Sequence, residues 1–305
     1  MDIGRALGIT WEWMVCMLFR PFRLKIWLGL GFVVLMIGAF SGVLHGLFGT
    51  VENSRFFVGR VIPEVFSDWL TKFWPLAIPS APILFLLVMW ISSVFNFVFI
   101  DDISRKSAAI REPFRRLSRL GTSFFLWQVV FGLILLAILF LLIMTRVDVL
   151  SQVDVAPGLN LFLRGLTSCV ICGAWLTQRF TIEFALVIMY ARDIHIIDAW
   201  KTLLPILKTN LVQVVYYTLL RVLFLLATWV VRMVAALIAM RVFTTHISQS
   251  SAAVFSALLG SILTLPVTVF IRSLPMVMLG QTDPLLMTIP LNSRHAQSPG
   301  NSPLG

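Results

Sequence analysis

Five charged residues stand inside long apolar stretches of the sequence. Arg179 and Glu183 fall in one stretch, Arg221 and Arg232 in another and Arg272 in a third, and Arg232 lies near the outer end of its stretch. An ionised Arg near the centre of a lipid bilayer costs about 3 kcal/mol on insertion scales, so each needs a partner, water or a route to the interface. Because Arg179 and Glu183 are four residues apart, they share one face of a helix, and we expect them to pair.

The three arginines lie at similar depths in their stretches. We count about 1.5 Å per residue from the end of each stretch that is expected to face the cytoplasm. Arg179, Arg221 and Arg272 then fall at depths of roughly 12 to 17 Å, and Glu183 is slightly shallower. If these arginines face one another, one carboxylate offsets three guanidinium groups, and a bound anion such as a lipid phosphate would complete the balance. Arg179, Glu183, Arg221 and Arg272 are therefore the candidate binding residues for an anion or a lipid headgroup.

A purely structural role is the alternative for the same four residues. Arg272 would then extend to the interface, Arg221 would bond backbone carbonyls, and the pairing of Arg179 with Glu183 would fix helix packing. Both interpretations place the informative residues in the second half of the chain, because the first three apolar stretches carry no formal charge.

Other residues with chemical potential fit structural roles better. Cys169 and Cys172 have the spacing of a redox or metal motif but lack a second ligand pair, so a pair of small packing residues is favoured. Asp101 and Asp102 could form a paired-carboxylate site, but beside Arg105 they resemble a solvated helix end. None of the four histidines neighbours a Cys, Ser or carboxylate in a recognised spacing. The sequence therefore predicts no catalytic residue, metal or cofactor, and favours a protein that is not an enzyme.

The composition explains what must position these charged residues. Of 305 residues, 59% are hydrophobic and only 12% are charged, so most of the chain faces lipid. A helix needs about 20 apolar residues to cross the hydrocarbon core. We therefore expect an all-α, polytopic helical membrane bundle in one domain, 1–280, followed by a disordered polar tail, 281–305. Six stretches qualify as transmembrane helices: 26–48, 76–100, 121–145, 165–190, 211–240 and 253–280.

The segments between these stretches predict an orientation. Fourteen Lys and Arg residues fall on one side of the six-span arrangement and six on the other, which places both termini in the cytoplasm. On that side, residues 3–20, 108–120 and 194–208 have helical periodicity and predict interfacial amphipathic helices. A unit of one interfacial helix followed by two spans thus occurs three times. Either the sequence is a true triplication, or the units look alike because any basic, amphipathic segment before a span has this pattern.

Several short motifs resemble a known family. They are Arg20-Pro21-Phe22 and the segments 97–101, 113–127, 183–190 and 271–273. Over most of residues 10–285 the chain resembles an uncharacterised bacterial family of six-span membrane proteins, which is loosely similar to the membrane domain beside some glycerophosphodiester phosphodiesterases. The resemblance implies a bacterial inner-membrane location and a six-helix fold, and it implies no activity.

The leading functional hypothesis is a non-enzymatic membrane protein that organises lipids or partner proteins through its amphipathic helices and buried arginines. The alternative is a transporter or lipid translocator that uses the arginines of the last three spans. The expected partners are membrane lipids, anionic ones among them, and proteins. A net charge of +10 does not indicate nucleic acid, because most of the basic residues flank hydrophobic stretches.

Overall fold

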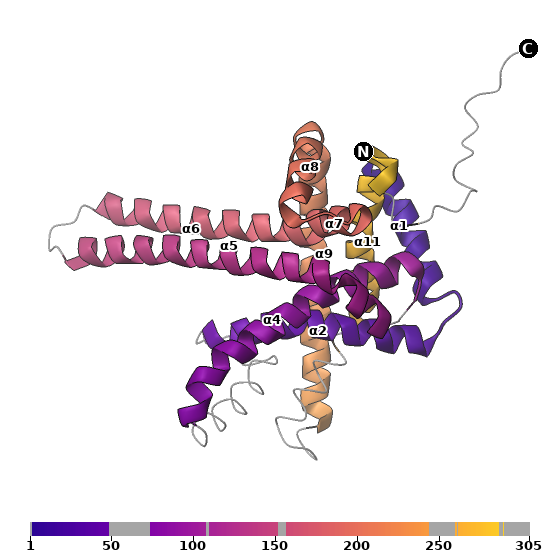
Figure 1. Ribbon diagram of the computed structural model, residues 1–305, viewed down its shortest axis with the longest axis horizontal. Helices are drawn as coiled ribbons and strands as arrows, with labels where there is room; N and C mark the ends of the chain where they lie inside the picture. The colour runs from indigo at the N-terminus through magenta and orange to yellow at the C-terminus, as the bar shows by residue number, and fades with distance from the viewer. Residues whose placement is uncertain are drawn as a thin grey trace, which may run out of the picture.

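The described part of the chain consists of helices and the short segments between them, with no strand. The computed structural model describes residues 2–48, 74–107, 110–151, 157–243, 260, 262–286 and 289, and Figure 1 shows their arrangement. The all-α prediction is confirmed for these residues. The elements are α1 (Ile3–Leu18), α2 (Leu24–Phe48), α4 (Trp74–Arg105), α5 (Arg111–Ser151), α6 (Pro157–Phe180), a π-helical turn η2 (Thr181–Ala185), α7 (Leu186–Arg192), α8 (Ile196–Thr209), α9 (Leu211–Phe243), α11 (Leu265–Thr282) and a 3-10 turn η3 (Pro284–Leu286).

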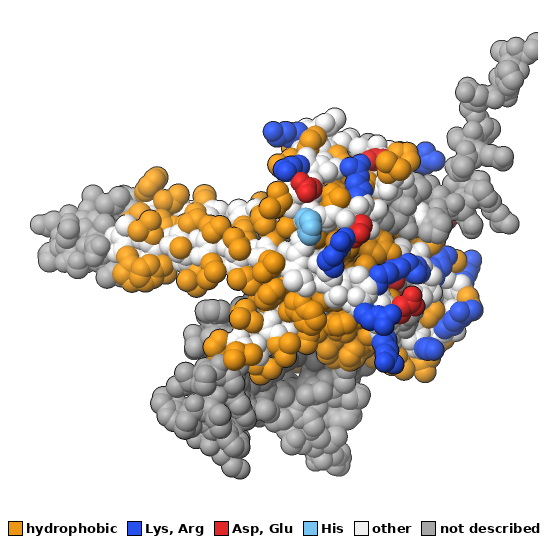
Figure 2. All heavy atoms as spheres, in the orientation of Figure 1, with side chains coloured by type: hydrophobic (Ala, Val, Ile, Leu, Met, Phe, Trp, Pro, Cys, Tyr) orange, Lys and Arg blue, Asp and Glu red, His pale blue; other side chains and the backbone are white. Residues whose placement is uncertain are grey.

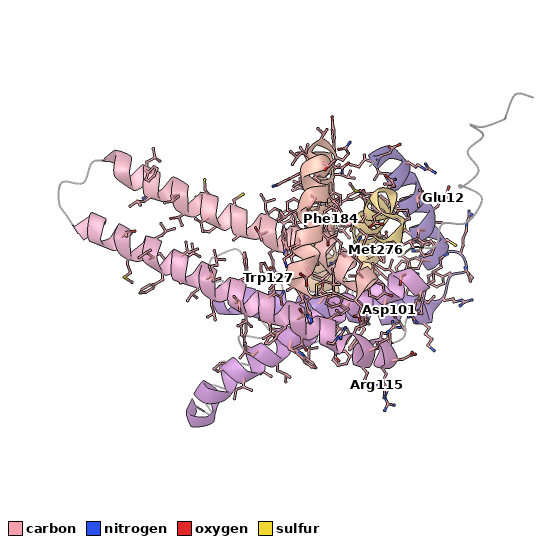
Figure 3. All side chains as sticks on the ribbon, turned by 45° about the horizontal axis from the view of Figure 1, so that its top comes forward. Glu12, Asp101, Arg115, Trp127, Phe184 and Met276 are labelled. Carbon is pink, nitrogen blue, oxygen red and sulfur yellow. The ribbon has the colours of Figure 1, made fainter. Side chains whose placement is uncertain are left out.

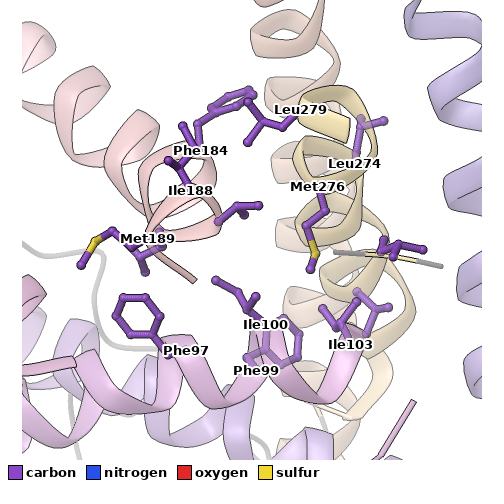
Figure 4. Close-up of a cluster of buried hydrophobic side chains, with 14 of the residues drawn as sticks. Phe97, Phe99, Ile100, Ile103, Phe184, Ile188, Met189, Leu274, Met276 and Leu279 are labelled. Carbon is purple, nitrogen blue, oxygen red and sulfur yellow. The ribbon is translucent and has the colours of Figure 1, made fainter. Parts of the chain in front are cut away.

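The core forms where α4, the η2–α7 segment and α11 meet. Ser92 to Ile103 of α4 form an unbroken buried run, as expected for a helix that is covered on every side. Figure 4 shows three groups of side chains that converge on this centre, one from each element. They are Phe97, Phe99, Ile100 and Ile103 from α4, Phe184, Ile188 and Met189 from η2–α7, and Leu274, Met276 and Leu279 from α11.

The crossing of α4 and α5 depends on a glycine. A Cβ at Gly121 would lie 2.5 Å from Cγ2 of Val94 and 2.8 Å from its Cα, so the two helices approach more closely than any side chain allows. Gly121 therefore serves packing and does not interrupt the helix. Leu117, Leu120 and Phe124 are buried along one face of α5, on both sides of this glycine.

This continuity corrects one prediction. The expected interfacial helix 108–120 is not separate from the expected span 121–145, because α5 runs unbroken from Arg111 to Ser151. The other two predicted short helices are separate elements, α1 and α8. Asp2 begins α1 as an N-cap, since its Oδ1 accepts hydrogen bonds from the backbone N–H groups of Gly4 and Arg5.

The antiparallel pair α5–α6 projects away from the core (Figure 1). Large apolar side chains cover its described surface, as Figure 2 shows, and Leu133, Leu136 and Leu141 are each more than 60% exposed. Apolar surface of this extent is typical of a segment that contacts lipid. Four described helical segments are long and apolar enough to cross a membrane: Pro82–Arg105, Arg111–Thr145, Leu161–Arg192 and Leu211–Val231.

The bundle of six spans is not confirmed. The apolar part of α2 within the described side chains, Leu24–Gly38, is shorter than a span, and residues 253–259 of the expected sixth span lie outside the described residues. In Figure 1, α9 crosses the direction of α5 and α6 and does not run beside them. The long helices therefore spread from a common core in different directions.

The first residues of the expected disordered tail, 281–286, belong to the folded structure. Helix α11 continues to Thr282, and Leu286 and Ile289 are buried. The side-chain oxygen of Gln281 accepts a 2.7 Å hydrogen bond from the backbone N–H of Asp2, which ties this segment to the N-terminus. The prediction of disorder from residue 281 is wrong for these first residues, because a few apolar side chains anchor an otherwise polar segment. Residues 290–305 lie outside the described residues.

Candidate functional site

A buried ion pair between Glu183 and Arg221 is the centre of the candidate site. Glu183 belongs to η2 and is 2% exposed, while Arg221 belongs to α9 and is 9% exposed. The hydroxyl of Tyr217 donates a 2.8 Å hydrogen bond to the second carboxylate oxygen of Glu183. Tyr217 and Arg221 are four residues apart, so one face of α9 presents both groups to the same carboxylate.

The pairing differs from the one that the sequence predicts. Glu183 pairs with Arg221 and, among the described contacts, not with Arg179, so the predicted Arg179–Glu183 ion pair is wrong. The reason is the π-helical turn η2, whose wider i→i+5 spacing moves residues four apart off a common face. Arg179 instead places its guanidinium carbon 5.6 Å from the ring centre of Trp175, within the range of a cation–π contact.

Arg272 of α11 completes the cluster from a third direction. Its Nη1 donates a 2.9 Å hydrogen bond to the carbonyl of Ile182, and its Nη2 donates a 2.7 Å bond to Oδ1 of Asn96. The amide of Asn96 donates in turn to the carbonyl of Ser92. Ile182 lies in η2, where the π-type spacing frees backbone carbonyls for outside donors. Arg272 thus joins α11, η2 and α4, and does not extend to the interface.

The four predicted site residues therefore come together, with an excess of positive charge. Arg221 pairs with Glu183, Arg272 bonds the carbonyl of Ile182 next to Glu183, and Arg179 precedes Glu183 by four residues. In the described part of the chain this cluster holds three guanidinium groups and a single carboxylate, that of Glu183. Nε of Arg221 is buried without a hydrogen-bond partner, and no acceptor among the described residues bonds the guanidinium of Arg179. These donors, together with two uncompensated charges, favour the binding of an anion.

Two members of the cluster escaped the sequence analysis. Tyr217 and Asn96 are neutral, so no charge marks them inside their apolar stretches. The spacing of Tyr217 to Arg221 was a usable signal, because a polar residue one turn from a buried charge is well placed to share its partner. For Asn96 no comparable signal exists, since its partner Arg272 is far away along the chain.

A second polar centre surrounds Asp101, near the end of α4. Its Oδ1 accepts a 2.6 Å hydrogen bond from the hydroxyl of Tyr190, and it pairs with Arg105 at 3.0 Å and with Arg116. Asp101 is 1% and Asp102 0% exposed, so the prediction of a solvated helix end is wrong. Both carboxylates are buried because α4 continues to Arg105 and packs against α5 and α7.

The surroundings of Asp101 are more open than the residue itself. Figure 3 shows Arg115 pointing away from the helices, while Asp101 lies among them. Arg119 pairs with Asp193 at 2.7 Å, and Arg192 pairs with Asp283 of the C-terminal segment. Helix α7 thus follows directly on the turn that holds Glu183 and ends at these ion pairs.

The cysteine pair does not form a site. Cys169 and Cys172 are exposed on α6, so the prediction that they are packing residues is wrong for the described structure. They lie on the projecting α5–α6 pair, where few protein atoms surround them. Within the described ranges, no three His, Cys, Asp or Glu side chains are close enough to hold a metal ion.

Comparison with protein families places the chain. A model of a family of unknown function, DUF7544, matches residues 2–289. The chain belongs to this family. No curated protein and no solved structure matches it. DUF7544 membership agrees with the predicted resemblance to an uncharacterised family, and no finding supports the similarity to the membrane domain beside glycerophosphodiester phosphodiesterases.

Proposed function

We propose that this protein is a non-enzymatic integral membrane protein that binds an anionic group at the arginine cluster and thereby organises lipids around itself. The observation that carries this proposal is the charge balance of Arg179, Arg221 and Arg272 against Glu183. Two positive charges stay uncompensated in a site that holds a 2% exposed carboxylate.

The energetics of buried charge support binding over a purely structural role. Removing a cation from water costs several kcal/mol unless a partner compensates it. Each hydrogen bond from a guanidinium to an anion contributes about 1.5–3 kcal/mol. Arg272 already has two protein acceptors, whereas Arg179 has none among the described residues, so an anion at Arg179 gains the most.

We further propose that the protein lies in a bacterial inner membrane with both termini in the cytoplasm. The excess of basic residues in the segments around α1, the start of α5 and α8 supports this orientation. Figure 2 shows Lys and Arg side chains gathered where α4 ends and α5 begins, and over α8, whereas the projecting α5–α6 pair is apolar. This distribution suits a molecule whose basic end contacts anionic headgroups.

Ligand-dependent stability tests the anion site. The purified protein is heated with and without phosphate, sulfate or vesicles that contain anionic lipid, because a ligand of the folded state raises Tm in proportion to ln(1 + [L]/Kd). We expect at least one anionic ligand to raise Tm in the wild type and in Arg164→Leu, and to have no effect on Arg179→Leu. Arg164 is a matched control, since it is an exposed arginine of the same helix.

Arg179 is a better target than Arg221. Removing Arg221 would leave the carboxylate of Glu183 buried without its ion partner and would destabilise the fold whatever the function. Arg179→Leu removes no ion pair among the described residues. A Tm shift that is the same in wild type and Arg179→Leu for every anion would overturn the proposed site.

A second candidate, a transporter or lipid translocator, draws on the π-helical turn. Irregular backbone inside a membrane segment is tolerated where it lines a binding site or cavity, and η2 holds Glu183 beside the arginines. Reconstituted protein that moves labelled lipid or anionic solute across a liposome membrane would favour this candidate, provided that Arg179→Leu abolishes the movement and Arg164→Leu does not. Absence of movement for lipid and solute alike would reject it.

A further inference from the structure

We propose that the anion is the phosphate monoester of a membrane lipid, of the phosphatidate class, which reaches the cluster sideways from the bilayer across Trp175 and Arg179. This inference rests on the proposed anion site and names its ligand. It follows from the exposure of α6, the charge of the cluster and the donors that the protein leaves open.

The route follows one stripe of α6. Ile171, Trp175 and Arg179 stand at intervals of four residues, so their side chains succeed one another along the helix. Ile171 is 51% and Trp175 40% exposed, whereas Arg179 is half-buried over the Trp175 ring. The stripe thus leads from an apolar outer surface to the first arginine of the cluster.

The apolar surroundings favour a lipid over a dissolved ion as the source of the anion. Large apolar side chains are exposed on α9 as well, with Tyr216 and Leu219 each 61% exposed. A free inorganic anion on such a surface loses its hydration and gains nothing from the surface. A lipid places acyl chains against the same side chains and brings its phosphate to Arg179.

The charge of the cluster favours a phosphate monoester over a phosphodiester. Three guanidinium groups and one carboxylate leave two positive charges. A phosphate monoester carries about −1.5 to −2 charges at pH 7, with its second pKa near 6, and therefore neutralises this excess. A phosphodiester carries a single negative charge and leaves one positive charge buried. The low exposure of Arg221, 9%, also favours a headgroup with no bulky substituent on the phosphate.

The open donors identify which arginines bind. Arg272 uses both terminal nitrogens on Ile182 and Asn96, so it contributes charge and not direct contact. Nε of Arg221 is buried without a partner, and Arg179 is held only by its ring contact among the described residues. A phosphate between these two arginines receives charge-assisted hydrogen bonds from both, with Arg179 on the lipid side.

Native mass spectrometry of the full chain in detergent tests the inference. The protein is titrated with dioctanoyl phosphatidate and with dioctanoyl phosphatidylglycerol, and inorganic phosphate serves as competitor. At pH 7.5 we expect phosphatidate to bind about tenfold more tightly than phosphatidylglycerol, and the preference to shrink at pH 5.5, where the monoester holds its second proton. Arg179→Leu should weaken phosphatidate binding about tenfold, whereas Arg164→Leu should leave it unchanged.

The other outcomes separate this inference from the proposed function. Equal binding of both lipids, or displacement of phosphatidate by equimolar inorganic phosphate, overturns the lipid monoester while the anion site stands. Binding of phosphatidate and of phosphate that is the same in wild type and Arg179→Leu overturns both. If Arg179→Leu is recovered in poor yield, Arg179→Lys keeps the charge but loses the planar fork, and it should still reduce the preference for phosphatidate.

Discussion

Replacing Glu183 by Gln removes the only carboxylate that the described residues contribute to the cluster, and it keeps the shape of the side chain. In the wild type this carboxylate pairs with Arg221 and accepts a hydrogen bond from Tyr217. The substitution turns an excess of two positive charges into an excess of three at a residue that is 2% exposed. Breaking a buried ion pair from one side costs about 3–5 kcal/mol, so we expect Glu183→Gln to lower Tm by on the order of 10 °C.

The same variant should bind anions more tightly than the wild type. Without the competing carboxylate, Arg221 offers an additional terminal N–H group to the ligand, and the attraction of the cluster for an anion increases. The rise in Tm on adding anion should therefore be larger in Glu183→Gln, although its starting Tm is lower. Scanning fluorimetry with and without dioctanoyl phosphatidate measures both quantities.

Tyr217→Phe is the matched control for this experiment. It removes the hydrogen bond to the carboxylate and leaves every charge in place, so we expect a loss of about 1–2 kcal/mol in stability and unchanged anion binding. If Glu183→Gln is as stable as the wild type, or binds anion more weakly, then Glu183 does not offset the arginines and the charge argument is refuted.

Two further predictions concern the framework around the site. Asp101→Asn should reduce the free energy of unfolding by about 3 kcal/mol, because Asp101 is 1% exposed and pairs with two arginines. The control Asp193→Asn changes an exposed ion pair and should reduce the free energy of unfolding by less than about 1 kcal/mol. Equal losses of stability in thermal unfolding would contradict the burial of the Asp101 pairs. Gly121→Ala should reduce the free energy of unfolding by about 1–3 kcal/mol, because its Cβ would lie 2.5 Å from Val94. The control Gly132→Ala places its Cβ in open space and should leave the stability unchanged. Equal unfolding temperatures for the two variants would refute the close crossing of α4 and α5.

Hydrophobic patterning predicted much of the secondary structure. Long apolar runs indicated the helices α4, α5, α6 and α9, since a chain in lipid must satisfy its backbone hydrogen bonds within each helix. The same runs made the charged residues conspicuous. Arg179, Glu183, Arg221 and Arg272 were candidates for this reason, and the structure brings them together.

The sequence alone could not predict which arginine pairs with Glu183. The segment Thr181–Ala185 carries no signal for a π-helical turn, and that turn decides which arginine meets Glu183. Tyr217 and Asn96 were missed because they are neutral, and their roles depend on contacts between distant segments. Asp101 was misjudged because a buried acid and a solvated helix end look the same when only the neighbouring residues are known.

The distance from an arginine side chain to a bound phosphate tests the anion site most directly. Solid-state NMR with ¹³C-labelled arginine and the natural ³¹P of dioctanoyl phosphatidate measures the separation of Cζ and phosphorus through dipolar dephasing. Charge-assisted hydrogen bonds of 2.7–2.9 Å place these two atoms about 4 Å apart, so we expect strong dephasing from two arginines, one of which disappears in Arg179→Leu. Dephasing that is absent in the wild type, or that persists unchanged in Arg179→Leu, would contradict the binding of an anion by this cluster.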